Sequence, residues 1–211
     1  MAIIYANTGD GYVAKIRQST WAGARDATSG VGNSSSTSSS NAITAMYALM
    51  KYGVYRSFLS FDTSGISSAV QSATLKIKGL SNGDGDIIAV KATSDISPLG
   101  GADFNAIEGW QASGDNESNV TKYSNTISSW NTSGYNSITL NSQALTDMKD
   151  TGTIYICLLN YSHDLNDSAP SSSTSKKNGM YYSDSLGTSK DPYIDYTLAP
   201  TDNAVFMGMN F

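Results

Sequence analysis

The sequence predicts an all-β protein, an antiparallel β-sandwich or barrel with long loops and at most one or two short helices. Charged residues make up only 15% of the 211 residues, aromatic residues make up 10%, and 13 residues are Tyr. Ser, Thr, Asn and Gly supply much of the remainder. This composition is typical of strands joined by turns, because the exposed faces of helices are normally rich in Glu and Lys. Short β-rich runs separated by turn clusters indicate the same fold class.

The expected strands are runs of β-branched, aromatic and aliphatic residues bounded by turn residues. They cover residues 2–6, 11–17, 55–62, 73–79, 86–93, 136–141, 153–160, 179–184 and 192–198. Between residues 73–79 and 86–93, the Asn-Gly and Asp-Gly steps predict a tight hairpin. Residues 42–53 fit a short helix or a strand, and SQALTDMKD (142–150) is the other candidate helix.

One domain is expected over residues 1–198, with two unusual segments. Residues 22–41 are rich in Ser and of low complexity, so we expect a long loop or an exposed arm there. Residues 199–211 form an apolar tail, which we expect to dock on the domain itself or on a neighbouring subunit. The expected assembly residues of this tail are Val205, Phe206, Met207, Met209 and Phe211.

The strand at residues 55–62 does not alternate between apolar and polar residues. Leu59 and Phe61 share one face, while Arg56, Phe58 and Asp62 share the other. The second face is therefore a buried ion pair, a binding surface or a seam against another chain. Arg56 and Asp62 lie ~20 Å apart on a straight strand, which is too far for direct pairing. Arg56 therefore needs another partner, and we expect Asp62 to cap the turn that follows it.

Charge and hydropathy exclude several classes of partner. The net charge of −5 and the pI near 4.7 argue against a nucleic-acid partner, because phosphate binding needs clustered Lys and Arg. No run approaches the ~18 apolar residues of a membrane span, so we expect no membrane partner. The N-terminus does not show an ordinary secretory signal. The single Cys157 is expected to be a small buried hydrophobe.

We expect no catalytic residues. Ser162, His163 and Asp164 contain the three residue types of a catalytic triad, but triad members converge from separate elements and these three are contiguous. Glu108 and Glu117 are candidates for a carboxylate pair, yet nothing in the sequence singles out two such groups.

Two kinds of ligand site have candidate residues, each with an ordinary alternative. Two acidic turns offer oxygen ligands for a structural Ca²⁺, or else cap turn backbone; their residues are Asp84, Asp86, Asp164 and Asp167. No other cofactor is expected. Aromatic rings offer stacking faces for a glycan, or else pack in the core; the candidates are Trp21, Trp110, Trp130, Tyr135, Tyr181 and Tyr182.

Several phrases together resemble a known style of β-sandwich. RSFLSFD (56–62) followed by ATLKI (73–77) resembles the core of the DNRLRE-type jelly roll, which is related to carbohydrate-binding module family 96. WNTSGYN (130–136) and GTSKDPYI (187–194) are similar to phrases of phage and viral structural proteins built on such jelly rolls. The resemblance implies a jelly roll in which residues 56–62 form an internal strand. It brings no catalytic residues with it.

The resulting functional expectation is a non-enzymatic bacteriophage virion protein, made in the host cytoplasm and located in the virion. It would decorate the capsid or belong to a head or tail fibre. We expect a homo-oligomer that contacts other virion proteins through its sandwich and its tail. The alternative is a carbohydrate-binding module that recognises a host surface glycan.

Overall fold

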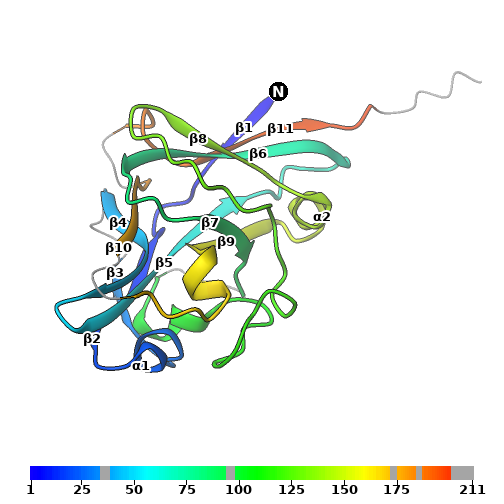
Figure 1. The fold of residues 1–211 in the computed structure, drawn as a ribbon. Coiled ribbons are helices and arrows are strands. Elements are labelled where there is room, and N and C mark those ends of the chain that lie inside the picture. The colour runs from blue at the N-terminus through cyan, green and yellow to red at the C-terminus, as the bar shows by residue number, and fades with distance from the viewer. Residues whose placement is uncertain (34–38, 94–97, 172–174, 184–186, 201–211) are drawn as a thin grey trace, which may run out of the picture.

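The computed structural model describes residues 1–33, 39–93, 98–171, 175–183 and 187–200 (Figure 1). The strands are β1 (Ala2–Tyr5), β2 (Gly11–Gln18), β3 (Val31–Asn33), β4 (Ser39–Ala48), β5 (Lys51–Asp62), β6 (Val70–Ser81), β7 (Ile87–Lys91), β8 (Tyr135–Thr139), β9 (Thr153–Asn160), β10 (Ser175–Tyr181) and β11 (Tyr193–Leu198). The helices are α1 (Trp21–Arg25) and α2 (Ser142–Asp150), with a 3-10 turn, η1 (Gly101–Asn105), and a π turn, η2 (Tyr161–Leu165). Within these residues, no helix is long and apolar enough to cross a membrane.

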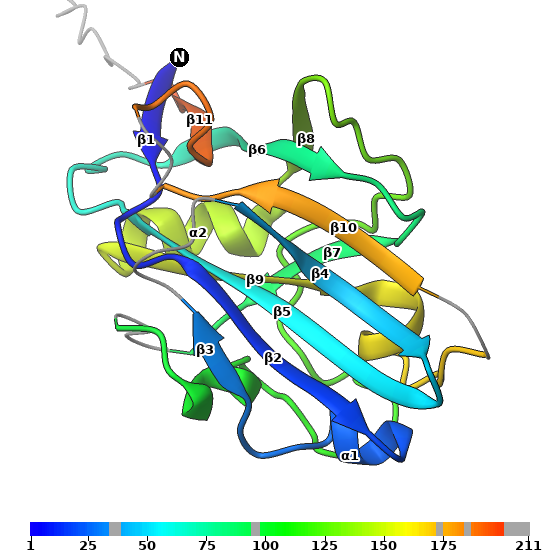
Figure 2. The ribbon, with the colours of Figure 1, turned by 90° about the vertical axis from the view of Figure 1, so that its left-hand side faces the viewer.

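The strands pair antiparallel in one large open sheet, which confirms the predicted all-β class. Strand β6 links its two layers. The first half of β6 lies between β11 and β8, with β1 beyond β11, and its end pairs with β10. From β10 the sheet continues through β4, β5 and β2 to β3. The second half of β5 pairs with β9, which pairs in turn with β7 (Figure 2).

Two hydrophobic cores lie on opposite faces of β5. The first contains Leu59 and Phe61 and fills the space between the two layers of the sheet. The second contains Phe58 and is covered by loops that carry Phe104 and Leu165. Residues 56–61 are all buried as a result. The strand does not alternate because neither of its faces meets water, a pattern that is ordinarily typical of strands covered on both sides.

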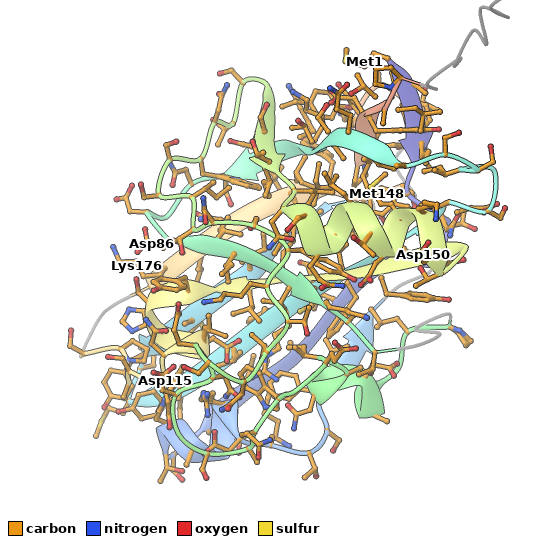
Figure 3. The ribbon with its side chains drawn as sticks, turned by 90° about the vertical axis from the view of Figure 1, so that its right-hand side faces the viewer. Met1, Asp86, Asp115, Met148, Asp150 and Lys176 are labelled. Carbon is orange, nitrogen blue, oxygen red and sulfur yellow. The ribbon has the colours of Figure 1, made fainter. Side chains whose placement is uncertain are left out.

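Helix α2 forms where the sequence predicts it. Asn141 caps its first turn by accepting a hydrogen bond from the backbone N–H of Ala144 at 3.1 Å. Ala144 and Met148 then face the first core, four residues apart on one side of the helix. Figure 3 looks onto the side of the molecule that carries α2, where Met148 and Asp150 are labelled.

Of the two interpretations of residues 42–53, the strand is correct: they belong to β4 and β5, which pair with each other across a turn. Two local predictions need correction. Strands β6 and β7 do not form a hairpin: β7 pairs with β9, so the turn between them carries the chain from one layer to the other. The segment 22–41 is more than a loop, since it contains most of α1, all of β3 and the start of β4. Its residues 34–38 lie outside the described residues.

Candidate functional site

A cavity of about 340 Å³ opens beside the end of β7. Its lining includes Lys91 at the end of β7 and Thr93 shortly after it. Glu108 and Tyr123 come from the loop between η1 and β8, and the first residues of β9 complete the lining. The β9 contribution includes the half-buried Tyr155. The lining therefore combines apolar and aromatic side chains with a few charged groups and hydroxyls in one concave surface, and ligand sites are commonly built from this combination.

Lys91 sits between two carboxylates at the wall of this cavity. Its Nζ lies 3.1 Å from Glu108 Oε2 and 3.1 Å from Asp147 Oδ2. Tyr123 donates its phenolic O–H to Asp147 Oδ2 at 2.5 Å, and Gln143 Nε2 donates to the other oxygen of Asp147 at 2.9 Å. We call Lys91, Glu108, Tyr123 and Asp147 the mixed-charge cluster.

Burial and hydrogen bonding act against each other at the carboxylate and the amine of this cluster. Desolvation raises the pKa of Asp147, but the hydrogen bonds from Tyr123, Lys91 and Gln143 outweigh it, so the pKa lies below its ordinary value. Desolvation lowers the pKa of Lys91, and its two carboxylate partners more than reverse this, which leaves the pKa raised. Burial, and then the bond to Asp147, raises the pKa of Tyr123. At neutral pH the cluster presents one cation, ionised Asp147 and a neutral phenol.

The sequence did not identify the mixed-charge cluster. Glu108 was one of several carboxylates with nothing to distinguish it, and its partners are 17 and 39 positions away in the chain, at Lys91 and Asp147. The only local signal is Asp147 on the buried side of the amphipathic α2, three positions from Ala144. A carboxylate on a core-facing stripe needs a partner.

Arg56 is the centre of a second charged cluster, which is buried. Its Nε and one terminal nitrogen form a bidentate pair with Asp164 at 2.8 and 2.7 Å. Its remaining N–H groups donate to the carbonyls of Phe104 and Arg25 and to Asn105 Oδ1. All five donors are satisfied, and the side chains of both Arg56 and Asp164 are fully buried.

Arg25 lies next to this pair. Its guanidinium donates to the carbonyls of Asp164 and Gly114 at 2.8 and 2.7 Å and to Asp26 at 2.8 Å. The ring of Trp110 contacts both guanidinium groups, with its centroid 3.9 Å from Arg56 Cζ and 4.7 Å from Arg25 Cζ. Of the three interpretations of residues 55–62, the structure therefore selects the buried ion pair. Asp62 caps its turn by accepting from Ser64, as expected.

The four aspartates predicted as calcium ligands do not gather in the structure. The carboxylate of Asp164 is occupied by Arg56, and Asp167 accepts from Trp21 Nε1 and from the backbone N–H of Gly114. Asp86 accepts from Ser162, while Asp84 is exposed in the turn after β6. Within the described ranges, no group of three or more His, Cys, Asp or Glu side chains is arranged to hold a metal ion.

Ser162, His163 and Asp164 do not face one another. The Oγ of Ser162 donates to Asp86, His163 Nδ1 lies 2.7 Å from the carbonyl of Ser168, and Asp164 binds Arg56. Because η2 turns each side chain toward a different partner, the three residues do not form a triad.

The six predicted stacking rings are scattered, and two are in the core. Trp130 is 5% exposed and donates to the carbonyl of Gly179, while Tyr182 is fully buried and hydrogen-bonded to Ser57. For these two rings the structure selects core packing over ligand stacking, because they fill space between the layers of the sheet. The others have separate neighbours: Trp110 contacts the arginines, Trp21 packs on Tyr52, Tyr135 packs on Tyr193, and Tyr181 lies under Lys190.

Strand β1 stands at the end of the strand order in the described structure and exposes apolar side chains there. Among the described residues, strand β1 pairs with β11 along one side and with no strand along the other. Ile4 packs against the first core, whereas Ile3 and Tyr5 point outward and are 52% and 42% exposed. The five predicted assembly residues of the tail, from Val205 to Phe211, lie outside the described residues.

Comparison with known proteins gives no relative from which a function can be transferred: no family model matches the chain, and a search of curated proteins finds no match.

The buried ion pair between Arg56 and Asp164 is expected to contribute to stability. Asp164→Asn leaves the guanidinium of Arg56 without its counter-charge, and we expect the free energy of unfolding to fall by about 3–5 kcal/mol. Asp84→Asn is the matched control, since Asp84 is exposed at φ 55°, a conformation that Asn adopts readily. We expect it to change the free energy of unfolding by less than about 0.5 kcal/mol. Urea unfolding of the two variants measures both values, and equal losses would contradict the assignment.

The raised pKa values predict a loss of stability at alkaline pH. Burial raises the pKa of Tyr123, of the fully buried Tyr182 and of Tyr135, the last to about 12. In the unfolded chain these phenols ionise near pH ~10. Above that pH the unfolded state releases protons that the folded state retains, so the free energy of unfolding falls as the pH rises. Urea unfolding between about pH 8 and pH 11 should show this decline, and Tyr123→Phe should make it shallower. An unchanged slope in that variant would contradict the role given to Tyr123.

Proposed function

We propose that the protein is a non-enzymatic structural protein that assembles with copies of itself and with other virion proteins, as a capsid-decorating or fibre-associated component of a bacteriophage. The observation that supports assembly is the open apolar edge at β1. The virion context is supported by the resemblance of residues 130–136 and 187–194 to phrases of phage and viral structural proteins, beside the resemblance of residues 56–62 and 73–77 to the core of the DNRLRE-type jelly roll.

An unpaired edge strand offers its backbone N–H and C=O groups to another strand. Soluble proteins commonly protect such edges with Lys, Pro or a bulge. Strand β1 reads AIIY and has none of these devices. In the described structure it presents Ile3 and Tyr5 on an edge that no further strand pairs with, which is the arrangement used in β-augmentation.

The same edge includes the origin of the apolar tail. Leu198 ends β11 at 44% exposure, and Ala199 is tied to the carbonyl of Ala69 at 2.8 Å. Figure 1 shows β1 and β11 side by side at one extremity of the molecule. The edge and the point from which the tail departs therefore lie on the same part of the surface. Two copies of β1 paired antiparallel about a two-fold axis would close it, which gives the dimer the simplest symmetry.

The mixed-charge cluster favours binding over acid–base catalysis. A general acid for glycoside cleavage needs a carboxyl group whose pKa is raised. The pKa of Asp147 is lowered, and both it and Glu108 share Lys91 as a counter-charge.

Ile3→Lys tests assembly through β1. The added charge would be desolvated in an interface, so we expect the mass of the full chain in solution to fall from an oligomer to a monomer, as measured by light scattering. Thr126→Lys, on an exposed loop, is the control and should leave the oligomer intact. A chain that ends at Pro200 tests the tail separately and retains the bond between Ala199 and Ala69. A wild-type monomer, or an oligomer unaffected by Ile3→Lys, would refute assembly through this edge.

The second candidate function is recognition of a surface glycan, and the cavity at the mixed-charge cluster favours it. Sugar hydroxyls bind carboxylates, an ammonium and threonine hydroxyls, while a sugar ring packs on an aromatic face. The cavity has all four groups, in Glu108, Lys91, Thr93 and Tyr155.

Glu108→Gln tests this second candidate. The glutamate accepts from Thr121 at 2.7 Å and is 46% exposed, so the amide fits without loss of fold. We expect affinity for a glycan identified on a glycan array to fall about tenfold, the effect of losing a charge-assisted hydrogen bond. Glu117→Gln, which removes a carboxylate bound to Lys122 outside the cavity, should leave affinity unchanged. Equal affinity of all three proteins would place glycan binding elsewhere.

A further inference from the structure

The turn between β4 and β5 exposes two large apolar side chains. Leu49 and Met50 are 96% and 78% exposed, and they form the turn with φ of 50° and 59°. A two-residue turn with both φ values positive normally contains Asn-Gly, because other residues are strained there. Leu49 and Met50 therefore oppose both the backbone preference of the turn and the tendency to bury apolar groups. Strain and exposure in the same two residues indicate a function for the turn.

Aromatic side chains form the base of this apolar tip. Tyr47 and Tyr52 face each other across the hairpin, with ring centroids 4.5 Å apart, and Trp21 packs on Tyr52 at 6.0 Å. Ile16 on the adjacent β2 adds a side chain that is 36% exposed. Tyr and Trp are enriched where an apolar surface meets water, since each ring has an apolar body and a polar end.

Cations surround the tip, although the chain as a whole is acidic. Strand pairing places Lys51 opposite Ala48, Lys15 opposite Val54, and two lysines of β10 opposite residues 44 and 45 of β4. The full set of five is Lys15, Arg17, Lys51, Lys176 and Lys177, out of 13 Lys and Arg residues in the chain. Counting along the strands at 3.3 Å per residue, the paired lysines lie within ~17 Å of the turn. In the described part of the chain, none of the five forms a salt bridge with a carboxylate.

We propose that the β4–β5 tip docks on a phospholipid bilayer that carries anionic headgroups. Leu49 and Met50 enter the interface, the rings of Tyr47, Tyr52 and Trp21 lie at headgroup level, and the five cations bind the lipid phosphates. Apolar insertion combined with basic side chains is the general requirement for reversible binding to a membrane surface. The cations specify an anionic bilayer as the occupant, because they are without carboxylate partners in the described structure.

The position of the tip is compatible with the proposed assembly. Figure 2 shows the β4–β5 hairpin and α1 at one end of the molecule and β1 and β11 at the opposite end. A subunit that assembles through β1 therefore leaves its β4–β5 tip free. The membrane proposal does not depend on the proposed function, since it also holds for a monomer.

Co-sedimentation of the full chain with vesicles tests the proposal. We expect binding to vesicles of phosphatidylcholine with phosphatidylserine and little binding to phosphatidylcholine alone, with the binding weakened by added salt. Leu49→Asn with Met50→Gly restores the residues that the turn prefers, so this double variant should fold at least as well as wild type. It should reduce partitioning by about tenfold or more, since the buried apolar area is lost.

Charge is tested separately by Lys15→Gln, Arg17→Gln and Lys51→Gln together. Partitioning should fall by roughly fivefold for each charge removed. Lys149→Gln, at an exposed position of α2, is the matched control and should bind like wild type. No wild-type binding, or equal binding by the Leu49→Asn and Met50→Gly variant, would overturn the proposal. Conversion of a wild-type oligomer to a monomer by that variant, without vesicle binding, would instead assign the tip to a protein interface and overturn the membrane proposal.

Discussion

The bidentate pair between Arg56 and Asp164 is the interaction on which the second core depends. Arg56 stands in the middle of β5, and Asp164 lies in η2, more than a hundred positions away. The other donors of Arg56 bind the chain at Phe104, Asn105 and Arg25, so one side chain ties α1, η1 and η2 to the same strand. A charge buried this deeply is tolerated only when every donor is satisfied, and here each one has a partner. The segments that cover this face of β5 therefore supply the hydrogen-bond partners that the buried guanidinium of Arg56 needs.

This covering layer also creates the mixed-charge cluster. The loop that runs from η1 to β8 is anchored at one end by the contacts of Phe104 and Asn105 with Arg56. From there it returns along β7. The backbone N–H of Glu108 donates to the carbonyl of Lys91, and Lys91 Nζ forms a salt bridge with the carboxylate of Glu108. Tyr123 follows on the same loop and reaches Asp147 on α2. The cavity therefore depends on the buried ion pair through the path of a loop, although the two clusters share no residue.

The sequence predicts where several strands lie, but it does not predict which strands pair with each other. Local composition was sufficient for β9 and β11, and the residues SQALTDMKD indicated α2. Local composition was not sufficient where strand pairing decides the structure: the apolar spacing of residues 42–53 fits a helix as well as a strand, and the pairing with neighbouring strands makes them β4 and β5. The Asn-Gly and Asp-Gly steps after β6 predicted a hairpin because such steps favour tight turns, yet β7 pairs with β9 instead. The strand spacing predicts that Arg56 has a partner other than Asp62, and Asp164 lies in an acidic turn, but no local rule connects the two residues.

The average composition of the chain does not describe the local surfaces at the two extremities of the folded domain. A net charge of −5 argues against anionic partners only if the charges are mixed evenly, and five cations gather near the β4–β5 tip. No helix of the described residues is long and apolar enough to cross a membrane, whereas the docking proposed for the β4–β5 tip needs only two apolar residues at a turn that cations flank. The same reasoning applies to β1, whose four residues are too few to affect composition. Both proposed surfaces depend on local geometry, so a composition-based expectation about partners describes the body of the domain and does not extend to its extremities.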